Sequence, residues 1–183
     1  MNSRTQDFDV LVIGGGPAGL AAAVSAQASG ARVALVDDNP ALGGQIWRTE
    51  KFNDTRKSNT PEAARWLQRV QAARIEFISG ARVYDQPQAG KLLAETFDGV
   101  LELRYRKLIL ATGARERFLP FPGWTLPGVA GAGGLQALVK TGLPIENKKV
   151  IVAGTGPLLL AVAAYLRQRG AQVLLIAEQA APS

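Results

Sequence analysis

Three glycines near the amino terminus have the spacing of a turn that binds a diphosphate group. Gly14, Gly16 and Gly19 follow an apolar run at residues 8–13 and open a stretch of small apolar residues. In a strand–turn–helix unit, the first glycine permits a tight turn, the second lets the backbone approach the phosphates, and the third lets the helix pack on the strand. The amides that begin the helix then point at the negative charge.

An acidic residue stands where a dinucleotide site would use one. Asp37 ends the next apolar run, residues 32–37, roughly 20 residues after Gly14. A carboxylate at that place accepts hydrogen bonds from ribose hydroxyls and repels a 2′-phosphate. A glycine-rich turn kept only for packing is the alternative. Because strand, turn, helix, second strand and acid follow in the right order, the sequence predicts a dinucleotide-binding site.

The elements that must position these residues predict an α/β protein. Twenty glycines and ten prolines among many Ala, Val and Leu residues suit tight turns between strands and helices. The apolar runs at 8–13 and 32–37 are typical of strands in a parallel sheet. Residues 20–30 are typical of a helix that connects these two strands. Residues 61–74 predict a second helix that begins at a proline. The polar stretch 39–60 is expected to be a functional or mobile loop.

A set of strands is expected after the second helix. Residues 75–85, 91–97 and 100–106 contain strand-like patches separated by turn residues, and they predict a small antiparallel meander. Residues 107–114 predict one more buried strand, which ends in a glycine turn.

The chain repeats its first unit. A shift of 140 positions carries Gly14 to Gly154 and also carries Gly16 to Gly156. The residues that close the first helix recur at the same offset, so the sequence predicts a second strand–helix–strand unit.

The second copy departs from the pattern at two positions. Leu159 replaces the glycine that corresponds to Gly19, and a branched side chain there is expected to push the helix away from the strand or toward the phosphates. Ala177 falls at the place of Asp37, and Glu178 lies one residue further, where a slip can turn a side chain to the opposite face. A mononucleotide, weakly held NAD(P) and a unit that only packs all stay open. The residues of this doubtful second site would be Gly154, Gly156 and Glu178.

The composition excludes several chemistries and partners. The chain has no cysteine and no histidine, which removes disulfides, thiolate metal sites, CxxC pairs and histidine general bases. Redox chemistry must therefore come from a bound cofactor, and we expect no metal. The charge of +6 is scattered, without the basic stripe of a nucleic-acid-binding protein. The longest uncharged apolar run, 157–166, is about half of what a membrane helix needs. We expect a cytoplasmic chain without a membrane span.

Several phrases of the sequence resemble a known class of flavoproteins. Residues 9–23, 33–47, 108–115 and 122–129 are similar to the enzymes with two dinucleotide-binding domains, the thioredoxin-reductase-like class. The phrases GGQIWR and GTGPLLLAVA resemble, within that class, the FAD-carrying subunits of opine oxidases, hydrogen cyanide synthase, proline and hydroxyproline dehydrogenases and sarcosine oxidase.

The resemblance implies that the first site holds FAD. The first glycine turn would contact the pyrophosphate, and Asp37 would contact the adenosine ribose. Val83 would contact the adenine edge, and the strand end at 111–113 would close over the cofactor. Trp47 and Arg48 could serve the flavin or could cover a loop. No catalytic side chain is assigned. The implied cofactor residues are Gly14, Gly16, Pro17, Ala18, Gly19, Asp37, Asp38, Gly43, Gly44, Gln45, Arg48, Val83, Ala111, Thr112 and Gly113.

The resemblance also implies a domain plan. Residues 1–120 would form a Rossmann-like FAD-binding domain of the three-layer ββα type with its meander, residues 121–147 a linker with a short helix, and residues 148–183 a truncated second βαβ unit. The first domain would lack its completing carboxy-terminal segment. We therefore expect the chain to be the amino-terminal part of a longer enzyme.

The function implied is that of an FAD-dependent oxidoreductase in which an amine, imino-acid or amino-acid substrate gives hydride to the flavin. Its partners would be that small molecule and a further subunit of a hetero-oligomer. One alternative is an NAD(P)H-dependent reductase of the thioredoxin or ferredoxin type, which would need an intact second fingerprint and, for thioredoxin, a CxxC pair. Another is a non-catalytic nucleotide-binding fragment.

Overall fold

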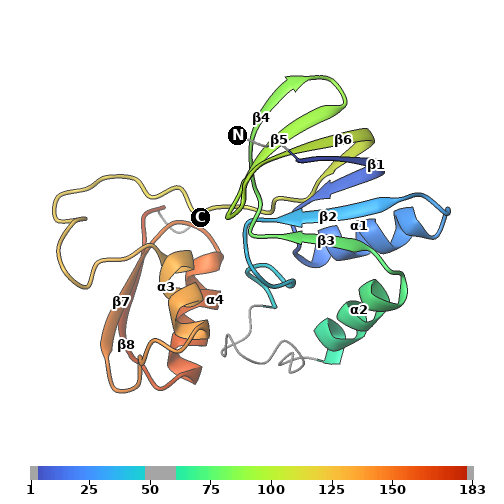
Figure 1. The fold of residues 1–183 in the computed structure, drawn as a ribbon. Helices are drawn as coiled ribbons and strands as arrows, with labels where there is room; N and C mark the ends of the chain where they lie inside the picture. Colours follow the sequence, from blue (N-terminus) through green and yellow to red (C-terminus); the bar gives the residue numbers. More distant parts are fainter. Residues whose placement is uncertain (1–3, 48–60, 181–183) are drawn as a thin grey trace. The chain divides into compact units, whose positions relative to one another are not determined.

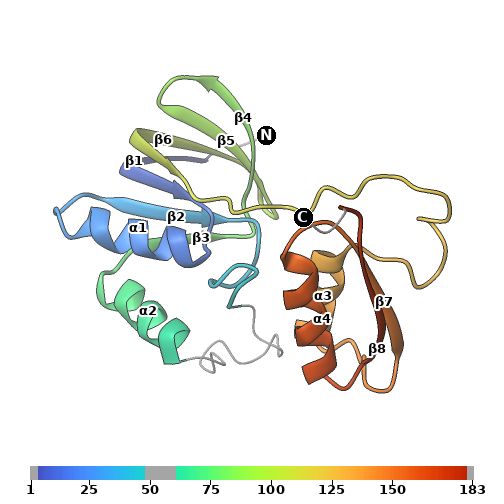
Figure 2. The ribbon, with the colours of Figure 1, turned by 180° about the vertical axis from the view of Figure 1, so that it is seen from behind.

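The computed structural model describes residues 4–47 and 61–180. The described residues divide after Gly113 into two compact units, which we call the first unit and the second unit. Figures 1 and 2 show the elements of each unit from two sides. In chain order the elements are β1 (Arg4–Ile13), α1 (Pro17–Gln27), β2 (Val33–Asp37), α2 (Pro61–Ala72), β3 (Glu76–Ser79), β4 (Arg82–Gln88), β5 (Lys91–Thr96), β6 (Gly99–Leu110), α3 (Ala132–Lys140), β7 (Lys149–Gly154), α4 (Leu158–Gln168) and β8 (Gln172–Glu178).

The first unit is built on a six-stranded sheet with the order β3-β2-β1-β6-β5-β4. Strands β3, β2, β1 and β6 run parallel to one another, whereas β5 pairs antiparallel with β6, and β4 pairs antiparallel with β5. Helices α1 and α2 lie on one face of the parallel strands, and the β4–β5 hairpin lies toward the other (Figures 1 and 2). The α/β class and the meander predicted from the sequence are confirmed.

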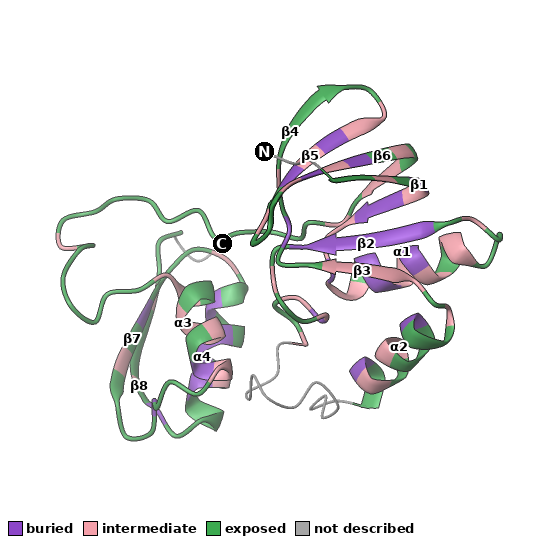
Figure 3. Cartoon of the chain, in the orientation of Figure 1, coloured by how far each residue is buried: buried purple, intermediate pink, exposed green. Residues whose placement is uncertain are grey.

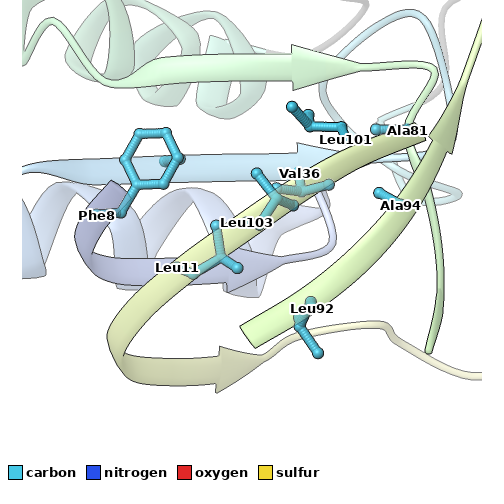
Figure 4. Close-up of a cluster of buried hydrophobic side chains, with 9 residues drawn as sticks. Phe8, Leu11, Val36, Ala81, Leu92, Ala94, Leu101 and Leu103 are labelled. Carbon is cyan, nitrogen blue, oxygen red and sulfur yellow. The ribbon is translucent and has the colours of Figure 1, made fainter. Parts of the chain in front are cut away.

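Two hydrophobic clusters fill the faces of the parallel strands, because β1 and β2 are apolar on both sides. Strand β2 is buried along its whole length (Figure 3). Under the helices, Leu20 and Leu35 are fully buried together. On the other face, Leu11 of β1 packs in one cluster with Leu92 and Leu103 of the meander (Figure 4). Helix, parallel sheet and meander therefore form the three expected layers.

Two strand predictions need correction. The segment Glu76–Ser79 pairs in parallel with β2, so this part of residues 75–85 belongs to the main sheet rather than to the meander. Residues 100–106 and 107–114 were expected to form separate strands, but Gly99–Leu110 is one strand that serves both β1 and β5. Its end is not buried, since the Leu110 side chain is 71% exposed in the described structure.

The second unit contains two parallel strands, β7 and β8, and the helices α3 and α4. Val139 of α3 and Ile145 lie in the same buried cluster as Leu166 of α4. The second unit accordingly includes the described residues from 114 onward. The sequence predicted a linker with a short helix at 121–147. The short helix expected in that segment is α3, and it shares a core with the second copy of the repeat.

An ion pair within the meander gives a testable pH dependence. The Lys91 ammonium lies 2.8 Å from the Glu102 carboxylate, and this hydrogen bond is the main cause that holds the pKa of Glu102 below its ordinary 4.5. Because the folded pKa is lowered, the stabilisation is present above the ordinary value and is lost as the pH falls through the lowered one. We expect Glu102→Gln to make the urea midpoint fall less steeply on acidification than in the parent chain.

The exposed Glu95 on β5 provides a matched control, since Glu95→Gln removes the same charge from the neighbouring strand. Urea unfolding followed across the acid range compares the three proteins. Equal pH profiles for both variants would contradict a specific role of the Lys91–Glu102 pair.

Candidate nucleotide-binding site

The first glycine turn connects β1 to α1 in a conformation that other residues would not adopt. Gly14 has a φ of +107°, and its N–H donates to the Val36 carbonyl at 2.8 Å. Gly16 is extended and caps the helix, and Pro17 is its first residue. A Cβ atom placed on Gly19 would overlap the Gly14 carbonyl oxygen. The third glycine is therefore required by the close contact between the helix and the turn.

Three chain segments meet at this turn through their backbones. The Gly43 N–H donates to the Gly15 carbonyl at 2.8 Å, and a Cβ on Gly44 would lie 2.9 Å from the Gly16 Cα. A Cβ on Gly14 would overlap the Ala111 carbonyl. The structure thus brings together the fingerprint, the double glycine of the following loop and the end of β6, which the sequence placed far apart.

Asp37 fixes the turn from the end of β2. Its side chain is buried, with the residue only 8% exposed, and its carboxylate accepts the Gly15 N–H. The other carboxylate oxygen accepts the backbone and side-chain N–H groups of Asn39, each at 2.7 Å. Asp38 is exposed and accepts a bond from the same asparagine. Of the two neighbouring acids, only Asp37 lies at the turn with its charge held by buried donors.

Sequence reasoning gave no role to Gly15 and Asn39, although both hold Asp37 in place. An aspartate followed two residues later by a residue that donates back to it is the pattern of an Asx turn, which could have identified Asn39. Gly15 could not have been identified from spacing, because the fingerprint defines only its two neighbours.

The outlying candidates lie at different distances from the turn along the chain. Val83 on β4 is half-buried and packs against the hydrophobic cluster that contains Leu92 and Leu103. Strand β4 follows Ala81, whose N–H donates to the Asp37 carbonyl at 3.0 Å. Trp47 donates its backbone N–H to the Gly43 carbonyl at 3.0 Å. Its side chain packs against the hydrophobic cluster that contains Leu20 and Leu35, which agrees with the alternative that it covers a loop. Ala18, Gln45, Thr112 and Gly113 are exposed. Arg48 lies outside the described residues.

The second glycine turn differs from the first because Leu159 is accommodated within the core. Leu159 is 7% exposed and joins the cluster around Val152 and Val162. Helix α4 begins at Leu158, one residue later than α1 begins in the first copy. The sequence predicts that a leucine here pushes the helix away from the strand or toward the phosphates; in the structure its side chain packs in the core of the unit, with its Cδ2 atom beside Gly154 of the turn.

A bulge in β8 changes which residue corresponds to Asp37. Val150 pairs with Val173, but Ile151 pairs with Leu175, so one residue of β8 is passed over. From there on the register places Glu178, rather than Ala177, opposite Gly154. Its carboxylate accepts the Gly156 N–H at 2.8 Å. The one-residue offset that was expected to turn Glu178 to the opposite face is therefore compensated by the bulge within β8.

No group of three or more acids, histidines or cysteines that could hold a metal ion occurs among residues 4–47 and 61–180. In the same ranges, no helix has the length and apolar character needed to cross a membrane.

A parallel sheet with a glycine turn, a buried acid at the next strand end, helices on one face and an antiparallel meander on the other define the class of Rossmann-like dinucleotide-binding folds. A family model described as pyridine nucleotide-disulphide oxidoreductase matches residues 8–182. The chain belongs to this family of FAD-dependent oxidoreductases, whose cofactor is FAD.

Individual relatives are similar over nearly all of the chain. It is 39% identical to an opine oxidase subunit from Agrobacterium tumefaciens (strain Ach5), over 94% of this chain and 37% of that protein. It is 33% identical to the HcnB subunit of hydrogen cyanide synthase from Pseudomonas protegens, over 93% of this chain and 38% of that protein. The chain therefore spans well under half the length of these curated relatives.

A solved structure shares the fold. The L-proline dehydrogenase from P. horikoshii superposes with a TM-score of 0.72 at 22% identity, over the whole of this chain and 38% of that one. The thioredoxin reductase from Lactococcus lactis superposes with a TM-score of 0.65 at 24% identity, over 93% of this chain and 56% of that one.

Proposed function

We propose that the first unit binds FAD with its diphosphate on the turn between β1 and α1. The observation that carries this proposal is the close approach of three backbone segments at the turn: a Cβ on Gly14 would meet the Ala111 carbonyl and a Cβ on Gly44 would meet the Gly16 Cα, while Gly16 itself presents no side chain. A surface kept bare of side chains and next to a helix N-terminus suits a diphosphate. The implied contacts of Val83, Gln45, Thr112 and Gly113 are part of the same proposal.

Asp37 would bind the ribose of the cofactor. Its carboxylate already accepts three N–H groups, one from Gly15 and two from Asn39, and a carboxylate has about four lone-pair sites, so it can still accept from one hydroxyl group. The negative charge would disfavour a phosphorylated ribose. The residue would thus both shape the turn and select the sugar.

The activity of the whole protein is proposed to be oxidation of an amino-acid-like substrate. Bound FAD supplies the electron sink for such a reaction. Support comes from the relatives named opine oxidase and sarcosine oxidase and the neighbour named proline dehydrogenase, whose named compounds are amino acids or their N-substituted derivatives. The relatives are also named as subunits, which supports a partner subunit for this protein.

A reductase of the thioredoxin type is the second candidate, because solved thioredoxin reductases share the fold. The 183 residues contain no cysteine, so this chain cannot itself supply a reactive dithiol. The repeated turn in the second unit is the remaining feature in its favour.

Titration of the cofactor-free chain with FAD and with riboflavin tests the binding site. Riboflavin carries the same ring without the diphosphate, so binding through the turn predicts a strong preference for FAD. Two charge-assisted hydrogen bonds of about 1.5–3 kcal/mol each correspond to a preference of at least about a hundredfold. Flavin fluorescence quenching measures both affinities. Equal affinity for the two flavins would contradict the proposal.

A further inference from the structure

The family to which the chain belongs pairs a flavin site with a second nucleotide-binding unit, and the second glycine turn is the place where a pyridine dinucleotide would fit. The two copies of the repeat allow a direct comparison of that fit. We infer that the second unit of this chain does not bind NAD(P)H, and that the electrons of the proposed flavin reaction come from the organic substrate. The second clause rests on the proposed function, whereas the first stands on the geometry of the second unit alone.

The backbone of the second turn differs from that of the first at its second glycine. In the first unit Gly16 has a φ of −78° and caps the helix, and the bare Gly19 allows contact between α1 and the turn. In the second unit Gly156 has a φ of +89°, and α4 begins at Leu158 after Pro157. The side chain of Leu159 lies over the turn, with its Cδ2 atom 3.2 Å from where a Cβ on Gly154 would be.

The leucine cannot simply move aside, because it is part of a buried core. It is packed with Val162 and Leu166 of its own helix and with Val152 of β7. Returning the helix to the position of α1 would therefore require this cluster to repack. The close helix-to-turn contact on which diphosphate binding relies is replaced here by side-chain packing.

The backbone donor that a phosphate would use is already occupied. Gly156 corresponds to Gly16, the residue whose backbone would face the diphosphate in the proposed FAD site of the first copy. Its N–H donates to the Glu178 carboxylate at 2.8 Å, whereas the first copy directs the N–H of Gly15 to its acid. The acid has therefore moved by one residue of the turn, onto the amide that matters for binding.

Glu178 also brings negative charge to this place. Hydrogen bonds lower the pKa of its carboxyl, the largest effect coming from the Ala180 N–H at 3.0 Å, so the group is ionised at neutral pH. A phosphate would have to displace this carboxylate from the Gly156 amide, whereas the acid of the first copy bonds the Gly15 amide instead. The buried Leu159 and the charged Glu178 therefore both disfavour a dinucleotide at the second turn.

Titration of the chain with NADH, followed by nicotinamide fluorescence, tests this inference without requiring flavin. We expect no saturable binding in the parent chain and saturable binding in the double variant Leu159→Gly/Glu178→Gln, with an affinity at least about tenfold above the detection limit that bounds the parent, since a single charge-assisted hydrogen bond is worth that much. Leu160→Gly/Glu178→Gln is the matched control, because Leu160 is 64% exposed on the same helix and the glycine has the same cost in helix propensity.

Saturable NADH binding by the parent chain would overturn the inference. A folded Leu159→Gly/Glu178→Gln variant that gains nothing over its control would overturn the role given to Leu159. Anaerobic mixing of the FAD-loaded chain with NADH adds a second measurement, in which we expect the flavin to stay oxidised. Loss of FAD binding would be seen separately in the flavin titration, so failure of the two proposals can be distinguished.

Discussion

Gly19→Ala is expected to lower the affinity of the first unit for FAD at least about a hundredfold. The added methyl group would overlap the Gly14 carbonyl oxygen, so α1 must move away from the turn. The amides at the start of the helix would then lose two or more charge-assisted bonds to the diphosphate, each about 1.5–3 kcal/mol. Overpacking adds a loss of stability of about 1–3 kcal/mol. FAD titration and urea unfolding measure the two effects separately.

Gly30→Ala is the matched control for this substitution. Gly30 follows the other end of the same helix, has a φ of +80° and has open space around it. The alanine should therefore cost about 1–2 kcal/mol of stability through its backbone conformation and leave FAD affinity unchanged. If both variants lost FAD equally, general destabilisation rather than the bare turn would explain the result.

Asp37→Ala is expected to weaken FAD binding by about ten- to a hundredfold and to destabilise the first unit. The substitution removes the acceptor of the buried Gly15 N–H, at a cost of about 1–3 kcal/mol, and also removes the bonds from the half-buried Asn39. The turn then loses the group that fixes it, and the ribose loses its proposed partner. Thermal unfolding with and without FAD separates the two losses.

Asp38→Ala provides the comparison for charge: the resemblance implies this acid too as a cofactor residue, but it is exposed and its carboxylate accepts the side-chain N–H of Asn39. We expect FAD affinity within about threefold of the parent, as for an exposed charge worth less than about 1 kcal/mol. An Asp38→Ala variant that lost FAD as strongly as Asp37→Ala would show that net charge, and not the buried carboxylate, governs binding.

The sequence was sufficient to predict the elements whose local chemistry is strong. The fingerprint, the apolar run that ends at Asp37, and the helix beginning at Pro61 all appear where expected, because each depends on residues close together in the chain. The three-layer arrangement followed from the resemblance rather than from periodicity.

What the sequence could not predict depends on contacts between distant segments or on register. The approach of Gly44 to Gly16 is a tertiary contact with no local pattern. The bulge in β8 cannot be deduced from spacing, so Ala177 was aligned with the acid of the first copy when Glu178 occupies that place. The sequence predicted two strands in place of β6, because the first half of β6 pairs with both β1 and β5 whereas the second half pairs with β1, and because the two halves differ in burial.

The long shared strand β6 has a consequence for how the protein acquires its structure during synthesis. Strand β1 emerges from the ribosome first, yet Ile13 pairs with Leu110, which is made much later. The hairpin of β5 and β6 has only short-range pairings, so it can form quickly. One edge of β1 can pair with β2 soon after synthesis, whereas its other edge must wait for the last residues of β6. During that interval the unpaired edge of β1 is exposed to aggregation, and we expect chaperone dependence to end once residue 110 has left the exit tunnel.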